Sequence, residues 1–118
     1  QAKVDGDAEL MIWGTGTPLR EFLDADDAAD ALVHILNRYS SPDIINVGTG
    51  IETSIAELAE AVTQAVGYQG RLVFDRTKPD GTPRKLMDSQ KLRGLGWAPK
   101  VKLVDGLRAA YQHYLATL

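Results

Sequence analysis

Residues 54–67 read Ser-Ile-Ala-Glu-Leu-Ala-Glu-Ala-Val-Thr-Gln-Ala-Val-Gly, and they combine a start signal, an apolar stripe and a stop signal for a helix. Ser54 and Glu57 match a capping box, in which the serine caps a backbone amide and the glutamate reaches back to the N-cap. Apolar residues recur at helical spacing as far as Val66, and Gly67 is typical of a left-handed C-cap. We therefore predict a helix over residues 54–66.

Short apolar runs on either side of this helix read as β-strands. Residues 44–47 (Ile-Ile-Asn-Val) follow the helix breaker Ser-Ser-Pro and are predicted to form a buried strand. Residues 72–74 (Leu-Val-Phe) give another short strand after the helix. Nearer the start of the chain, residues 10–13 (Leu-Met-Ile-Trp) and 20–23 (Arg-Glu-Phe-Leu) are also expected to be extended.

Two more amphipathic helices are expected from the spacing of apolar residues. The first spans about residues 27–38, with Asp26 or Asp27 as its N-cap and with acids in the first turn that favour the helix dipole. The second spans about residues 103–116 near the end of the chain.

A shorter helix is expected over residues 88–95, with Asp88 as its cap. Gly96 stands where a left-handed C-cap residue would, and Trp97 is expected to pack behind it. Short strands interleaved with four helices predict a small α/β or α+β domain, without a complete Rossmann domain.

Composition narrows the classes of function. The chain of 118 residues is 44% hydrophobic and 25% charged, as is typical of one soluble globular domain. Its net charge of −3 argues against a nucleic-acid partner bound through a basic surface, and no apolar run reaches the length of a membrane span. The absence of cysteine fits a reducing compartment, and we expect a cytoplasmic protein.

The segment between the third expected strand and the short helix has the composition of a binding loop. Residues 74–85 read Phe-Asp-Arg-Thr-Lys-Pro-Asp-Gly-Thr-Pro-Arg-Lys, with no helical or alternating period. The run Pro-Asp-Gly at 79–81 is a turn, because proline presets φ and glycine accepts positive φ. Lys78, Arg84 and Lys85 suit phosphate oxygens, and Asp80 suits a sugar diol. A solvated connector remains the alternative interpretation.

The residues alone indicate no catalytic machinery. His34 and His113 both fall inside expected helices and are interpreted as structural or solvent-facing. Asp24, Asp26 and Asp27 crowd at a helix start, where capping explains them better than metal binding. No metal site is therefore predicted.

Four segments occur in an order that is similar to one enzyme family. They are Trp-Gly-Thr-Gly-Thr-Pro-Leu-Arg-Glu-Phe-Leu at 13–23, Asn-Val-Gly-Thr-Gly at 46–50, Lys-Pro-Asp-Gly-Thr-Pro-Arg-Lys at 78–85 and Leu-Gly-Trp at 95–97. Together they resemble the C-terminal part of the GDP-L-fucose synthases, which belong to the extended short-chain dehydrogenases/reductases. The segment at 78–85 is the most specific to that branch.

The resemblance implies a substrate-binding role for four residues of this chain: Trp13, Arg20, Asp80 and Lys85. In the family the arginine and the lysine face the diphosphate and the nucleotide, and the tryptophan lines the wall of the pocket. Core packing of Trp13, an ion pair of Arg20 with Glu21 or a nearby aspartate, and a turn-only role of Asp80 are the alternatives. The resemblance also implies GDP-4-keto-6-deoxy-D-mannose as substrate, NADP as cofactor of the complete protein, and a possible homodimer.

Several parts of such an enzyme have no counterpart in this sequence. The family's glycine-rich dinucleotide motif, catalytic serine, Tyr-x-x-x-Lys pair and epimerisation Cys and His are missing, and the first residues show neither Met nor a targeting pattern. We expect a fragment that carries the substrate-binding domain over residues 1–118, lacks the N-terminal NADP-binding domain, binds no cofactor by itself and exposes an apolar face. Asp24-Ala25 replaces the usual His-Val, which puts packing near the sugar pocket in question.

Two classes of function therefore remain after the sequence is read. The first is the inactive half of an NADP-dependent epimerase/reductase, either a GDP-L-fucose synthase or another nucleotide-sugar epimerase or dehydratase. The second is a stand-alone binding or interaction module. Upstream coding sequence with an in-frame glycine-rich motif would separate them.

Overall fold

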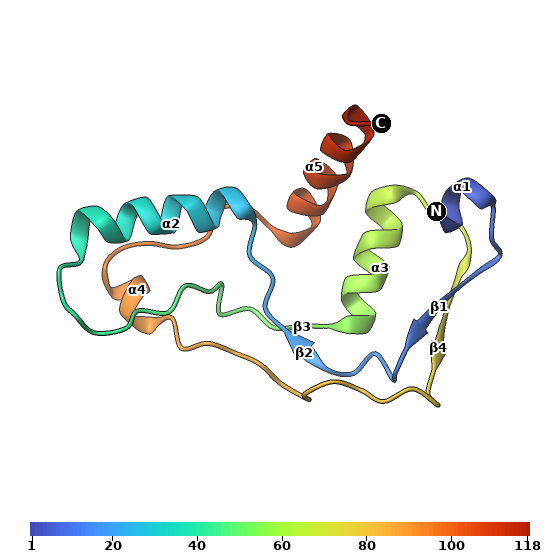
Figure 1. The fold of residues 1–118 in the computed structure, drawn as a ribbon, viewed down its shortest axis with the longest axis horizontal. Helices are drawn as coiled ribbons and strands as arrows, with labels where there is room; N and C mark the ends of the chain where they lie inside the picture. Colours follow the sequence, from blue (N-terminus) through green and yellow to red (C-terminus); the bar gives the residue numbers. More distant parts are fainter.

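The computed structural model describes all 118 residues and contains five helices and four short strands (Figure 1). In chain order the elements are α1 (Ala2–Asp5), β1 (Glu9–Trp13), β2 (Leu19–Arg20), α2 (Ala25–Arg38), β3 (Thr53–Ser54), α3 (Ile55–Val66), β4 (Arg71–Asp75), α4 (Gln90–Gly94) and α5 (Leu103–Ala116). The mixture of helices and short strands confirms the predicted α/β or α+β class.

Helix α3 has the ends that its sequence predicts. The Ser54 side chain accepts a hydrogen bond from the Glu57 amide, and the Glu57 carboxylate accepts one from the Ser54 amide, which completes the capping box. Gly67 ends the helix with a φ of 71°, in the left-handed region that favours glycine. The expected helix at 103–116 likewise matches α5 in both bounds.

Helix α2 begins earlier than predicted. Its N-cap is Asp24, whose side chain accepts a hydrogen bond from the Asp26 amide, so the predicted caps Asp26 and Asp27 lie inside the first turn. The physical reason is that Asp24 has the extended backbone of an N-cap residue, with φ −63° and ψ 144°. The Asp27 carboxylate accepts instead from the amides of Lys100 and Val101.

The strands form two separate two-stranded sheets. Strands β1 and β4 pair in parallel, with Met11 opposite Val73, and β2 pairs with β3 in the antiparallel sense. The predicted strand at residues 44–47 is wrong, because no strand pairs with that segment and Ile44 is 85% exposed. Only the start of the predicted strand at 20–23 is a strand, in β2.

The molecule is open rather than compact. Its radius of gyration is 17.1 Å, against about 13–14 Å for a compact domain of this length. Figure 1 shows α2 and α4 at one end and β1 with β4 at the other, while α3 packs against α5 between them. Only 10 of the 118 residues are buried, so most apolar side chains keep contact with solvent.

One small core lies at the end that holds α2 and α4. Leu92 of α4 and Ala31 of α2 are fully buried, and Trp97 is 4% exposed. Trp97 follows Gly96, which has a φ of 87° as expected for a left-handed C-cap position. The indole N–H of Trp97 donates to the Asp30 carboxylate at 2.9 Å, so this aromatic side chain joins α2 to the segment after α4.

The opposite surface of α2 carries exposed apolar side chains. Leu36 is 81% exposed, Leu32 59% and Val33 57%. An exposed apolar surface of this kind often marks a site of interaction with another protein surface. None of the helices is both long and apolar enough to cross a membrane.

We predict that Leu92→Ala lowers the free energy of unfolding by roughly 2–4 kcal/mol, because it leaves a cavity in the small core. Leu36→Ala is the matched control, since it removes the same atoms from an exposed helical position, and it should change stability by less than about 0.5 kcal/mol. Urea denaturation of both variants measures the difference. Equal effects would contradict the placement of the core between α2 and α4.

Candidate functional site

The candidate site is built from two loops that follow the paired strands β1 and β4. The Gly14 amide donates to the Asp75 carbonyl at 3.0 Å, so the parallel pairing continues by one residue beyond the strands. The Asp75 side chain accepts from the amide and the hydroxyl of Thr77 and so turns the second loop back. The loop over residues 14–18 and the loop over residues 76–83 therefore leave the sheet side by side.

Asp80 connects these two loops. Its Oδ1 accepts from the Thr15 amide at 2.8 Å, and its Oδ2 accepts from the Thr15 hydroxyl at 2.7 Å. Both hydrogen bonds lower the pKa of the Asp80 carboxyl below its usual value, with the side-chain bond as the larger cause. Gly14 makes the approach possible, because a Cβ there would lie 2.3 Å from Oδ1 of Asp80.

Trp13 stands at the end of β1 and is 72% exposed. Lys78 places its Nζ 5.4 Å from the centre of the Trp13 ring, within the range of a cation–π contact. The predicted alternative for this tryptophan, packing in a core, does not describe its position. An exposed indole with a cation nearby can take part in binding a planar or anionic group.

Arg20 and Lys85 lie on neighbouring stretches of backbone. The Leu19 amide donates to the Pro83 carbonyl at 2.9 Å, and the Lys85 amide donates to the Leu19 carbonyl at 3.4 Å. These bonds make a parallel bridge between Leu19 and Arg84. Because side chains alternate along extended chain, this register puts Arg20 and Lys85 next to each other on one face.

The Arg20 guanidinium makes few contacts within the chain. Its Nη1 donates to the Leu19 carbonyl at 2.6 Å, and a Cβ at Gly81 would lie 3.2 Å from its Nη2. Neither Arg20 nor Lys85 belongs to any ion pair of the structure, so the predicted alternative of an Arg20–Glu21 pair is absent. Both cations are available to an anionic ligand.

Arg84, the third cation expected at the loop, already forms an ion pair within the chain. Its Nε and Nη2 contact the two carboxylate oxygens of Glu52 at 2.5 and 2.6 Å, in a bidentate pair. The pair lowers the pKa of Glu52 and raises that of Arg84, mainly through the side-chain hydrogen bond. Arg84 therefore fixes the loop to the segment before β3 and does not offer a free guanidinium.

Glu21 joins two distant segments of backbone, a role that was not predicted from the sequence. Its Oε1 accepts from the Gly50 amide at 2.6 Å, and its Oε2 accepts from the Met87 amide at 3.0 Å. Gly48 leaves the room, because a Cβ there would lie 2.8 Å from Oε1. No sequence pattern could have found this role, since the partners are backbone amides far along the chain.

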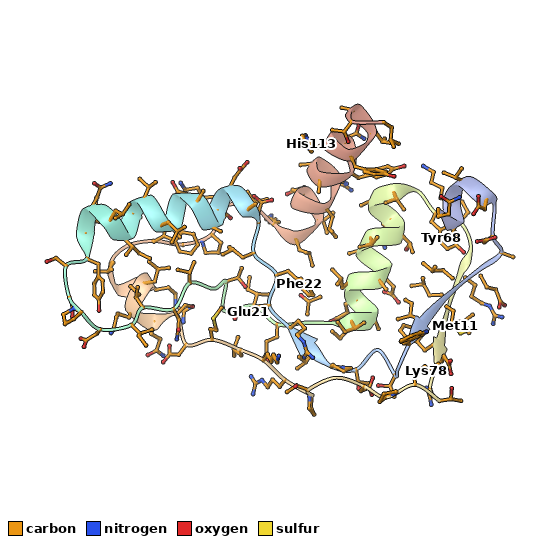
Figure 2. All side chains as sticks on the ribbon, viewed as in Figure 1. Met11, Glu21, Phe22, Tyr68, Lys78 and His113 are labelled. Atoms are coloured by element: carbon orange, nitrogen blue, oxygen red, sulfur yellow. The ribbon has the colours of Figure 1, made fainter.

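The two histidines lie at different places in the fold. The Nε2 of His34 lies 2.8 Å from the Leu95 carbonyl and links α2 to the end of α4. His113 lies in the exposed last turn of α5, away from the two loops (Figure 2). No cluster of three or more His, Asp or Glu side chains could hold a metal ion.

The glycine turns of this chain do not fit a dinucleotide. Gly16 and Gly50 have positive φ angles of 77° and 73°, but extended chain rather than a helix follows each turn. The first amides of α3 already donate within the chain, Ile55 to the Pro18 carbonyl, Ala56 to the Gly16 carbonyl and Glu57 to the Ser54 side chain, so they are not open to a pyrophosphate. Neither glycine turn therefore has the form of a glycine-rich turn that opens a helix, which is the usual cradle of a dinucleotide.

The groove with the most apolar lining lies elsewhere. It has a volume of about 470 Å³ and runs between α3, α5 and the segment before α2, away from Trp13 and Arg20. Asp24 and Ala25, which depart from the family pattern, line this groove. A Cβ on Gly106 would lie 3.0 Å from Oδ2 of Asp24, so the aspartate packs closely against α5 while it caps α2.

Comparison with known proteins points to one group of enzymes. A model of the NAD dependent epimerase/dehydratase family matches residues 1–48. GDP-L-fucose synthase 1 of Arabidopsis thaliana is 59% identical over 98% of this chain, which corresponds to 36% of that protein. GDP-L-fucose synthase of Escherichia coli is 44% identical over 98% of the chain and 39% of its own length. The chain thus spans little more than a third of these relatives.

Solved structures with a similar fold also carry the names of GDP-sugar enzymes. A GDP-L-fucose synthetase from Naegleria fowleri bound to NADP superposes with a TM-score of 0.89 at 28% identity, over 98% of this chain and 37% of that one. A GDP-6-OMe-4-keto-L-xylo-heptose reductase from C. jejuni gives a TM-score of 0.85 at 38% identity, over 93% of this chain and 34% of the other. In sequence and in fold, this chain is similar to one part of the GDP-L-fucose synthases and of related GDP-sugar enzymes.

Proposed function

We propose that this chain is the GDP-sugar-binding part of an NADP-dependent epimerase/reductase that converts GDP-4-keto-6-deoxy-D-mannose to GDP-L-fucose. Arg20 and Lys85 would hold the diphosphate, and Trp13 would line the wall of the pocket. The proposal draws on relatives that are GDP-L-fucose synthases and on a fold neighbour with bound NADP.

The observation that carries this proposal is the adjacency of two unpaired cations. Arg20 and Lys85 are 65 positions apart in sequence (85 − 20), yet the Leu19–Arg84 bridge makes them neighbours. Two like charges repel each other, so their juxtaposition without an acidic partner favours an anionic ligand between them. A diphosphate fits, because it accepts several charge-assisted hydrogen bonds at once.

The NADP-binding part of the enzyme would come from outside this chain. Two features support a covering domain on the side of α2: the exposed side chains Leu32, Val33 and Leu36, and the unpaired segment at residues 44–47. That domain would supply the dinucleotide cradle and the proton-transfer residues. This chain would supply the substrate surface.

Reductases for other GDP-sugars are the second candidate. The C. jejuni neighbour, a GDP-6-OMe-4-keto-L-xylo-heptose reductase by its name, shares 38% of its residues with this chain over the matched region. Both candidates bind GDP and differ in the sugar. A test with GDP alone therefore examines what the two candidates share.

We predict that this chain binds GDP weakly and that Arg20→Ala and Lys85→Ala each weaken binding by about tenfold or more, since each removes a charge-assisted hydrogen bond. Arg108→Ala is the matched control, because Arg108 pairs only with Asp105 on the exposed surface of α5. Isothermal titration at low ionic strength measures all four proteins. If the control loses as much affinity as the two site variants, the assignment of the diphosphate site is wrong.

We also predict that this chain alone neither binds NADPH nor consumes it with a keto-sugar nucleotide. The reason is that neither glycine turn leads into an open helix N-terminus and that the sequence lacks a Tyr-x-x-x-Lys pair. NADPH fluorescence titration and absorbance at the nicotinamide band measure the two properties. Substrate-dependent NADPH oxidation by the pure chain would contradict the proposed division of labour.

A further inference from the structure

We infer that Glu21 is a positioning residue for the proposed diphosphate site, and that its carboxylate keeps Arg20 and Lys85 side by side. The inference rests on the proposed function, because it needs an anion that binds between these two cations. Glu21 follows Arg20 directly in the sequence, yet the two side chains form no ion pair. The carboxylate of Glu21 therefore acts on the backbone and does not neutralise the guanidinium beside it.

Hydrogen bonds enclose the two cations from both sides along the chain. On one side, the Lys85 amide donates to the Leu19 carbonyl at 3.4 Å. On the other side, the Met87 amide donates to Oε2 of Glu21 at 3.0 Å. Arg20 lies between Leu19 and Glu21, and Lys85 begins the short segment that ends at Met87. The carboxylate thus closes the second side of a frame around the two cations.

The other carboxylate oxygen fastens the segment that leads into the partner strand of β2. Oε1 of Glu21 accepts from the Gly50 amide at 2.6 Å, in the turn that precedes β3. A Cβ on Gly48 would lie 2.8 Å from the same oxygen, so the carboxylate fits closely against this turn. Thr53 of β3 pairs with Arg20 across the antiparallel sheet. Glu21 therefore also fixes the strand on which the backbone of Arg20 depends.

The sign of the charge separates a positioning role from a purely electrostatic one. A carboxylate next to Arg20 reduces the attraction that the site exerts on an anion, so removal of its charge alone should strengthen anion binding. Arg20 and Lys85 also repel each other, and they separate when the backbone that carries them is released. The ligand must then bring the two cations together at a cost in affinity. A positioning role therefore predicts weaker anion binding without Glu21.

The first arm of the test is hydrogen exchange without any ligand. In Glu21→Ala the amides of Leu19 and Lys85 should exchange about tenfold faster, although neither donates to Glu21, because the frame that holds their bridge is open. The Tyr68 amide, which donates to the Thr63 carbonyl at the end of α3, is the internal control and should keep its rate. Unchanged exchange at both Leu19 and Lys85 would overturn the inference.

The second arm is titration with inorganic pyrophosphate and with GDP. Glu21→Ala should weaken the binding of both ligands by about tenfold or more, since two hydrogen bonds to a charged acceptor are lost. Glu21→Gln keeps one oxygen acceptor and should weaken both ligands by a smaller factor. If Glu21→Ala does not fold, Glu21→Gln decides alone, because loss of charge predicts tighter binding and loss of position predicts weaker binding. Tighter binding in either folded variant would overturn the inference.

Two controls separate position from charge and from stability. Glu60→Ala removes an exposed acid of α3 that forms no ion pair, and it should leave the affinity for pyrophosphate unchanged. Leu92→Ala weakens the buried core away from the cations, and the folded fraction of that variant should bind pyrophosphate as the unchanged chain does. If Leu92→Ala loses as much affinity as Glu21→Ala, the effect of Glu21 is one of general stability and the inference is wrong.

The titrations also separate the failure of this inference from the failure of the proposed function. If the unchanged chain binds neither pyrophosphate nor GDP, the proposed diphosphate site fails, and the positioning role fails with it. If the unchanged chain binds both ligands and Glu21→Ala binds them as Glu60→Ala does, the proposed function stands and the inference about Glu21 is overturned.

Discussion

The carboxylate of Glu21 holds three separate stretches of backbone in one place. Glu21 itself follows β2, its Oε1 binds the Gly50 amide in the turn before β3, and its Oε2 binds the Met87 amide on the way to α4. Hydrogen bonds to a charged acceptor are among the stronger ones in proteins. Figure 2 shows Glu21 near the middle of the elongated molecule, between the two groups of helices.

The rest of the fold depends on these hydrogen bonds of Glu21 because each end of the molecule buries few side chains. The buried core consists of Ala31, Leu92 and Trp97, and the other end is a two-stranded parallel sheet beside α3 and α5. Two parallel strands alone are marginal, and a core of three residues is too small for a domain of this length. Polar contacts of Glu21 and of the Arg84–Glu52 pair therefore help to hold distant segments of the chain together. The same contacts fix the path of the backbone on either side of Arg20.

Elements whose ends are set by local chemistry could be predicted from the sequence. The capping box of Ser54 and Glu57 lies within four residues, and the structure has α3 and α5 where they were expected. The predicted strand at residues 44–47 failed because a strand needs a partner, and no other segment of this chain pairs with it. The N-cap of α2 was misplaced because three acids within four positions offer equivalent local signals, and only the backbone angles choose Asp24.

The sequence could name candidate site residues, but it could not give their arrangement in space. The resemblance named Trp13, Arg20, Asp80 and Lys85, and the structure adds that Arg20 and Lys85 are register neighbours. The occupation of Asp80 by Thr15 could not be foreseen, because the two residues lie 65 positions apart. The same holds for Glu21, whose partners are backbone amides 29 and 66 positions away and leave no mark on side-chain patterns.

We propose that the loops after β1 and β4, together with the bridge beside β2, form one surface for the diphosphate of a GDP-sugar. Mapping of amide chemical shifts in the ¹⁵N-labelled chain during a titration with GDP tests it most directly. We expect shifts that cluster at Thr15, Arg20, Gly81 and Lys85, with the indole N–H of Trp13 among them. Shifts confined to the apolar groove between α3 and α5, or no shifts at millimolar GDP, would contradict it.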